Sequence, residues 1–131
     1  MLGWFKKKTP PPPSSGPDFS AIDSRSKAEK LCRQGALEKL FLLPLEFGGQ
    51  DVALNTLFVP PGLAAVKAGI DNNIIAPLVA AGKITQYQAT PEYQGKSFIP
   101  IAIKIVAFEP GKFETTINIW GDALKRDGET T

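Results

Sequence analysis

The residue types that most enzymes need for acid–base or metal chemistry are nearly absent from this chain. It contains no histidine and a single cysteine, Cys32, in 131 residues. Histidine titrates near neutral pH and is the commonest metal ligand, so its absence excludes Ser–His–Asp and Cys–His catalysis. Zinc sites built from Cys and His are excluded for the same reason. Chemistry would depend on carboxylates, lysine, tyrosine or backbone groups, and the sequence predicts neither a metal nor a cofactor.

The first candidate site is the loop around Gly48 and Gly49, where Glu46 and Asp51 flank a tight turn. Two carboxylates on one loop could accept a basic side chain of a partner or hold a divalent cation. The loop lacks the regular oxygen-ligand spacing of a calcium loop and the Lys-Ser/Thr pair of a phosphate loop. A turn with solvated carboxylates is the simplest interpretation, and contact with a partner is the main functional alternative.

The second candidate is the segment Pro91–Gly95, which contains Glu92 and Tyr93 between two predicted strands. Tyrosine supplies a large contact area with little loss of conformational entropy, and it is enriched at binding surfaces. We therefore predict Glu92 and Tyr93 as partner-binding residues. An ordinary hairpin connection is the alternative.

The third candidate is Trp120, at the end of a predicted hairpin of strands 98–108 and 113–120. The alternation of side chains along these strands places Trp120 on the face opposite the isoleucines. If the helix covers only the isoleucine face, Trp120 belongs to an exposed apolar patch, and such patches mark interfaces. The alternative is that the first helix or the segment 37–43 covers it.

A hydrolase that uses a pair of carboxylates is a further alternative, since a glycosidase needs two at a set separation in a groove. The acidic residues that could supply such a pair are Glu46, Asp51, Asp71, Glu92 and Glu114. Nothing in the sequence shows that they converge. Convergence of Glu46 or Asp51 with Glu92 in one pocket is the feature that would support this alternative, and the prediction is that the protein is not an enzyme.

The elements that would position these residues follow from hydrophobic periodicity and from helix and turn signals. A short helix begins after Ser24, a good N-cap, and ends near Gly35. A long helix covers 61–82, with an apolar stripe that includes Val66 and Ile74, and Pro77 is expected to kink it. The other segments have the pattern of strands: 37–45, 55–59, 84–90, 98–108 and 113–120.

An α+β fold is the architecture that buries these faces. We predict an antiparallel or mixed sheet of about four to five strands, with helix 61–82 across one face and a short N-terminal helix. Residues 1–18 form a disordered, Pro-rich tail, residues 19–121 form one compact domain, and residues 122–131 form a charged tail.

The bulk properties bear on location and on partners. A net charge of +2, with three of the 15 basic residues in one run, gives no support for nucleic-acid binding. That run follows two aromatic residues, so the tip could contact a membrane surface through Trp4, Phe5, Lys6, Lys7 and Lys8. The order is the reverse of a signal peptide. The expected location is cytoplasmic, with peripheral membrane contact as an alternative, and the lone cysteine agrees with a reducing compartment.

Four stretches carry a resemblance to a known family: LPLEFGGQD (43–51), NTLFVP (55–60), PEYQGKSFIP (91–100) and TINIW (116–120). Together they resemble a family of small, uncharacterised bacterial domains over residues 40–120. The resemblance implies a bacterial origin and one compact domain. No functional residue is carried over, because we know of no established activity for the family, although many such domains act beside toxins or secretion systems.

The prediction is a non-catalytic protein-binding domain, either an immunity-type inhibitor or an adaptor associated with a toxin or a secretion system. An inhibitor needs only a complementary surface with aromatic anchors, which this chain can supply without histidine. The predicted partner-binding residues are Glu46, Asp51, Glu92, Tyr93 and Trp120. The alternatives are a membrane-peripheral structural protein tethered by residues 4–8 and the carboxylate-dependent hydrolase.

Overall fold

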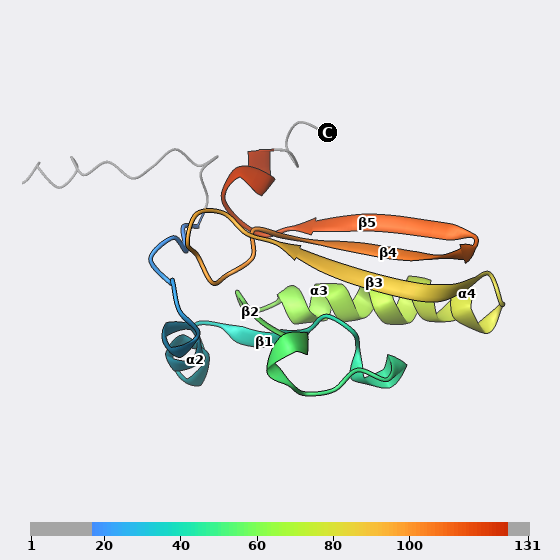
Figure 1. The fold of residues 1–131 in the computed structure, drawn as a ribbon, viewed down its shortest axis with the longest axis horizontal. Coiled ribbons are helices and arrows are strands. Elements are labelled where there is room, and N and C mark those ends of the chain that lie inside the picture. Colours follow the sequence, from blue (N-terminus) through green and yellow to red (C-terminus); the bar gives the residue numbers. More distant parts are fainter. Residues whose placement is uncertain (1–16, 126–131) are drawn as a thin grey trace, which may run out of the picture.

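The α+β fold predicted from the sequence is confirmed in the computed structural model, which describes residues 17–125 (Figure 1). The predicted tail residues 1–16 and 126–131, including the membrane-contact tip, lie outside the described residues. The helical elements are α2 (Arg25–Arg33), η2 (Leu45–Phe47), η3 (Ala53–Asn55), α3 (Leu63–Ile70), η4 (Asp71–Ile75) and α4 (Ala76–Ala80). The strands are β1 (Glu38–Phe41), β2 (Thr56–Val59), β3 (Ile84–Glu92), β4 (Ala102–Pro110) and β5 (Lys112–Asn118).

The five strands form two antiparallel sheets, whereas the sequence predicts one. β1 pairs with β2 alone, and β4 lies between β3 and β5 in the other sheet. Alternation along a strand identifies its two faces but not its neighbour, which explains the error. The helix lies along one face of the three-stranded sheet (Figure 1).

The helix α3–η4–α4 runs from Leu63 to Ala80 and contains one π-helical turn, η4. The distortion expected from Pro77 therefore lies just before the proline. A proline ring clashes with the carbonyl group four residues earlier, here that of Asn73 in η4, and lacks an N–H to bond it. At the other end of the helix, the Glu38 carboxylate accepts hydrogen bonds from the amides of Gly62 and Ala64, each at 2.9 Å. A carboxylate at a helix N-terminus is favourable because it pairs with unsatisfied N–H groups.

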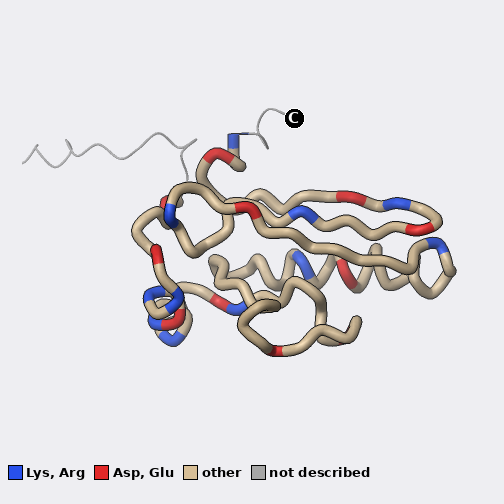
Figure 2. Tube along the Cα trace, in the orientation of Figure 1, with Lys and Arg blue, Asp and Glu red and all other residues tan. Residues whose placement is uncertain are grey.

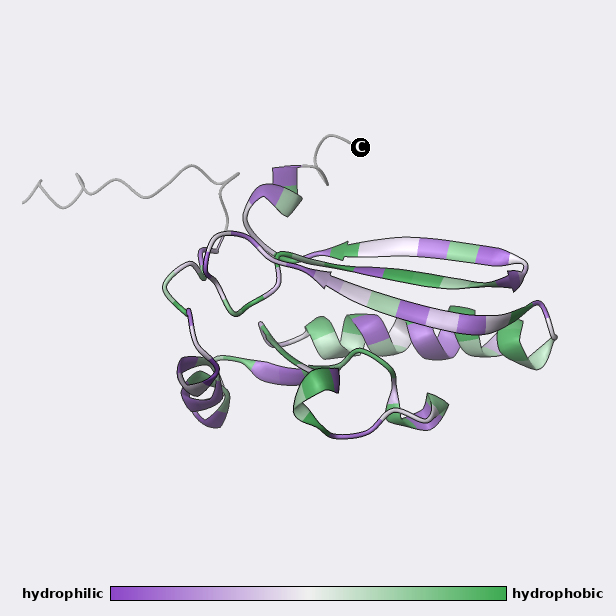
Figure 3. Ribbon diagram, in the orientation of Figure 1, coloured by the Kyte–Doolittle hydropathy of each residue, from purple (hydrophilic) through white to green (hydrophobic). Residues whose placement is uncertain are grey.

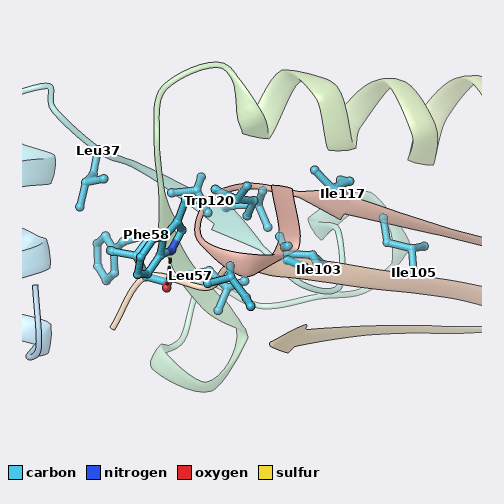
Figure 4. Close-up of a cluster of buried hydrophobic side chains, with 14 of the residues drawn as sticks. Leu37, Leu57, Phe58, Ile103, Ile105, Ile117 and Trp120 are labelled. Carbon is cyan, nitrogen blue, oxygen red and sulfur yellow. Dashed lines mark hydrogen bonds between the residues drawn. The ribbon is translucent and has the colours of Figure 1, made fainter. Parts of the chain in front are cut away.

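The isoleucine face of the predicted hairpin forms the core, which confirms that part of the prediction. Its side chains are at most 4% exposed: Ile99, Ile101, Ile103, Ile105 and Ala107. Leu57 and Phe58 of β2 lie in the same buried cluster (Figure 4). β1–β2 and the three-stranded sheet therefore share one hydrophobic core.

Trp120 lies in this core and not on an outer apolar patch, so of the two alternatives that the sequence left open, the covered position is correct. The side chain is 2% exposed, its Nε1 donates to the Ile99 carbonyl at 3.1 Å, and the Phe19 ring packs edge-on at 5.8 Å. β5 ends at Asn118, so the alternation that places Trp120 on the outer face does not reach it. The covering ring comes from the segment before α2, which the sequence argument did not consider.

The C-terminal boundary also differs from the prediction, which assigns residues 122–125 to a charged tail. They form a helical turn in which Ala123 is fully buried. The amide of Asp122 donates to the side-chain oxygen of Gln94 at 2.9 Å. The compact part of the chain therefore includes these residues.

Candidate functional site

The structure does not bring the predicted site residues together. Glu46 lies in η2, where its neighbour Phe47 packs edge-on against Tyr87 with ring centroids 5.6 Å apart. Glu92 follows Tyr87 by five residues on β3, so the two residues are roughly 16 Å apart along the strand at about 3.3 Å per residue. Glu92 lines neither of the two cavities beside Glu46, so the convergence that would support the hydrolase alternative is not found. Among residues 17–125, no group of three His, Cys, Asp or Glu side chains could hold a metal ion.

Of the other predicted contact residues, Tyr93 and Asp51 are at the surface, at separate places, whereas Trp120 lies in the core. Tyr93 is 47% exposed in the loop after β3. Asp51 is exposed on the loop after η2, with its carboxylate 4.0 Å from the Lys39 ammonium group. Only Glu46 adjoins a cavity described below, so it is the predicted residue around which a site can be built.

The loop that carries Glu46 is held in a fixed shape by Asn55. The side-chain oxygen of Asn55 accepts from the Leu43 amide at 2.8 Å, and its Nδ2 donates to the carbonyls of Leu43 and Gln50, each at 3.0 Å. Gly48 has a φ of 99°, and a Cβ at Gly49 would lie 2.0 Å from the Leu43 carbonyl oxygen. The glycines and Asn55 of the LPLEFGGQD…N pattern therefore have structural roles, and Glu46 projects from a rigid turn.

Behind this loop lies a buried polar cluster that the sequence analysis missed. The ammonium group of Lys67 donates to Asp71 Oδ2 at 2.6 Å and to the Tyr87 hydroxyl at 2.7 Å. The Tyr87 hydroxyl in turn donates to Asp71 Oδ1 at 2.8 Å. Lys67 and Asp71 are each 3% exposed, so the helix directs its charges into the protein. The signal in the sequence was a lysine and an aspartate at i, i+4 with no other charge nearby.

Burial controls the ionisation of this cluster. Desolvation lowers the pKa of Lys67, while the hydrogen bond and charge of Asp71 and the charge of Glu46 oppose that shift. Desolvation also raises the pKa of Tyr87, and the negative charge of Asp71 adds to the effect. A lysine with a lowered pKa can act as a base or nucleophile. Here, however, the ammonium group is already hydrogen-bonded to Asp71 and Tyr87. The arrangement is suited to holding the Tyr87 ring in place as a neutral phenol.

Two cavities adjoin the loop, and the Glu46 side chain lines both. The smaller, of about 240 Å³, lies between β1, the loop and α3 and reaches Lys67 and Asp71. The larger, of about 450 Å³, has a wall that is mainly apolar and aromatic: Leu43, Phe47, Ile75, Val79 and Tyr87, with Thr85 and Gln86. Within residues 17–125, Glu46 makes no hydrogen bond or ion pair. An exposed carboxylate on a fixed turn thus stands beside an apolar cavity.

Replacing Tyr87 by phenylalanine tests the buried cluster through pH. Tyr87→Phe removes a hydrogen bond to a carboxylate, so we expect it to lower the free energy of unfolding by about 1.5–3 kcal/mol near neutral pH. The raised pKa of Tyr87 means that the unfolded chain ionises first, above pH of about 10. The stabilisation is therefore complete below about pH 10 and is lost as pH rises further. Urea unfolding at several pH values measures the difference between wild type and variant.

The control for this prediction is Tyr93→Phe, in the loop after β3. Tyr93 is 47% exposed, so we expect a loss of less than about 1 kcal/mol near neutral pH. An advantage of wild type over Tyr87→Phe that stayed constant up to pH 11 would show that Tyr87 is not held as the neutral form.

Comparisons with known proteins identified no relative of this chain. No match was found among protein-family models, curated proteins or solved structures. The resemblance to small bacterial domains therefore stays a prediction, and the case for a function is made from the geometry of the chain itself.

Proposed function

We propose that this chain is a non-catalytic protein-binding domain that contacts its partner through the outward side of the helix Leu63–Ala80. The observation that carries the proposal is the position of the charges. Between Pro60 and Gly82 the only charged residues are Lys67 and Asp71, and both are buried against each other. In Figure 2 this helix has one blue stretch for its basic residue and one red stretch for its acidic residue, and the rest of it is tan.

The outward side of this helix is unusual for a surface in water. A surface helix normally places charged residues toward solvent and apolar residues toward the core. Here Val66, Ile74 and Val79 are 51%, 40% and 50% exposed. This corrects the predicted apolar stripe, in which Val66 and Ile74 face the core. We call the exposed residues of this helix the uncharged helix face: Ala65, Val66, Ala68, Asn72, Asn73, Ile74, Pro77, Val79 and Ala80.

The uncharged helix face resembles the centre of a protein interface, where charged residues are depleted. The outer side of the three-stranded sheet provides the contrast within the same molecule. There Lys104 pairs with Glu114 at 3.0 Å and Lys112 with Glu114 at 3.4 Å, as on an ordinary solvated surface. Figure 3 shows green at both ends of the helix, where α3 begins and α4 ends. The two sides of the protein thus differ in what they can bind.

The finer assignments remain part of the proposal. An immunity-type inhibitor or an adaptor needs only a complementary surface, and the occupied lysine of the buried cluster favours binding over catalysis. By length and composition, Leu63–Ala80 is the one described helix that is apolar enough to cross a bilayer. In the folded chain it packs against both β1 and β3. Because of its length and composition, the exposed side of this helix could contact a membrane instead of a protein, and the experiment has to distinguish the two.

The test places a photoreactive benzophenone amino acid at Val66, and at Thr116 on the outer sheet as a control, in the native cell. We expect one discrete protein adduct from position 66 and none from position 116. Adding Val79→Lys should abolish the adduct, because it introduces a charge into the uncharged helix face. The matched variant Val52→Lys, at a side chain that is 47% exposed on the loop, should leave it unchanged.

Two results would contradict the proposal. Adducts of similar yield from positions 66 and 116 would mean that the helix face is not a preferred contact. Loss of a protein adduct together with cosedimentation with anionic vesicles, abolished by Val79→Lys, would assign the face to a membrane.

A further inference from the structure

We infer that the cavity beside Glu46 receives a long basic side chain, arginine or lysine, of the protein partner. The inference rests on the proposed function for the source of that side chain, but its chemistry comes from the cavity alone. Val79 belongs both to the uncharged helix face and to the wall of the cavity of about 450 Å³. A partner on the helix face would therefore reach the cavity without a break in contact.

Charge complementarity selects a cation. Glu46 is the only charged residue that lines the larger cavity. Lys67 and Asp71, which line the adjoining smaller cavity, pair at 2.6 Å and compensate each other's charge. The charge that the wall of the larger cavity itself presents is therefore negative, which favours a cation over an anion.

The walls select a cation with an apolar stem. Phe47 and Tyr87 meet edge-on, and Leu43, Ile75 and Val79 complete the lining. Lysine and arginine bury their methylene groups along apolar surface while the charged end pairs with a carboxylate. Aromatic rings add attraction for an ammonium or guanidinium group. A divalent metal ion is a poor fit, because it needs several oxygen ligands where this cavity offers one carboxylate.

The parts of the site are preorganised, which reduces the cost of binding. Asn55 fixes the loop that carries Glu46 through three hydrogen bonds. Tyr87 is fixed through its hydroxyl by Lys67 and Asp71. The volume of about 450 Å³ lies within the range of small-ligand pockets, about 300–1,000 Å³.

The test needs no partner, because Nα-acetyl-arginine methylamide can serve as the probe. Its neutral isostere, the corresponding citrulline derivative, has the same shape without the charge. In NMR titrations of the full chain we expect saturable shifts of the Phe47 and Tyr87 amides with the arginine probe, in the millimolar range. The citrulline probe should bind about two- to fivefold more weakly, the usual scale for a partly exposed ion pair.

Two variants assign the effect to one carboxylate. Glu46→Gln should reduce affinity for the arginine probe to that of citrulline. Asp51→Asn removes the same charge from the same loop, but Asp51 does not line the cavity, so affinity should be unchanged. No saturable binding, equal binding of the two probes, or an equal loss in both variants would overturn the inference. Each of these results leaves the crosslinking test of the helix face unaffected, so the two proposals fail separately.

Discussion

Asp71→Ala is expected to lower the free energy of unfolding by about 3–5 kcal/mol, the usual cost of removing one partner from a buried ion pair. The substitution leaves the Lys67 ammonium group, which is 3% exposed, without its carboxylate. It also removes the acceptor of the Tyr87 hydroxyl. Since natural domains are stable by about 5–15 kcal/mol, the variant should be close to the limit of folding. Urea unfolding followed by circular dichroism measures the loss.

The pH dependence of this variant separates a buried charge from a simple cavity. Burial already lowers the pKa of Lys67, and Asp71 opposes that shift, so the pKa should fall further in Asp71→Ala. The folded variant then releases a proton at a pH where the unfolded chain, with a lysine pKa near 10.4, still holds it. Stability of the variant should therefore rise with pH up to about 10. A loss that did not change with pH would contradict an uncompensated Lys67.

Two controls complete this prediction. Glu114→Ala breaks exposed ion pairs with Lys104 and Lys112 and should change the stability little, because solvent screens such pairs. The double variant Lys67→Met/Asp71→Leu removes both charges of the buried pair. Replacing a buried pair with apolar residues is often nearly neutral, so the double variant should be more stable than Asp71→Ala. If it were less stable, the pair would contribute more than the mutual neutralisation of its charges.

The parts of the fold that could be predicted from the sequence are those in which local pattern and burial agree. Alternation between Ile99 and Ala107 identified the core face, because a strand with one buried face repeats every two residues. Ser24 was predicted as an N-cap, and its side chain accepts a hydrogen bond from the Lys27 amide. Each of these features depends on residues close together in the chain.

The candidate site could not be predicted in the same way. A lysine on a helix is almost always solvent-exposed, so Lys67 was not identified as buried. Its burial depends on Tyr87, 20 residues later and on a strand, and on Asp71 one turn further along the helix. Because the charged residues of the helix point inward, some of its apolar residues point outward. The sequence pattern therefore placed Val66 on the wrong side of the helix. Glu46 was identified because a carboxylate beside a glycine turn is visible locally, whereas Asp71 was named only as one of five acidic residues.

Trp120→Ala is expected to destabilise the chain by about 3–5 kcal/mol, the usual range for a buried tryptophan. The indole is 2% exposed, contacts the Phe19 ring and donates to the Ile99 carbonyl. Its removal should loosen the end of the domain where the segment before α2 meets the loop before β4. Thermal or urea unfolding measures the loss, and Tyr93→Ala, at a side chain that is 47% exposed, should cost about 1 kcal/mol or less.

Trp120→Phe separates this structural role from the contact role that the sequence predicted. It keeps a ring in the core but leaves the Ile99 carbonyl without the indole N–H, at a cost of about 1–3 kcal/mol. The variant should stay folded, and its yield of the adduct from position 66 should equal that of wild type. If Trp120 were instead a partner anchor, stability would hardly change and the adduct would be lost. A stable Trp120→Phe variant that no longer binds would therefore contradict the buried position of the indole.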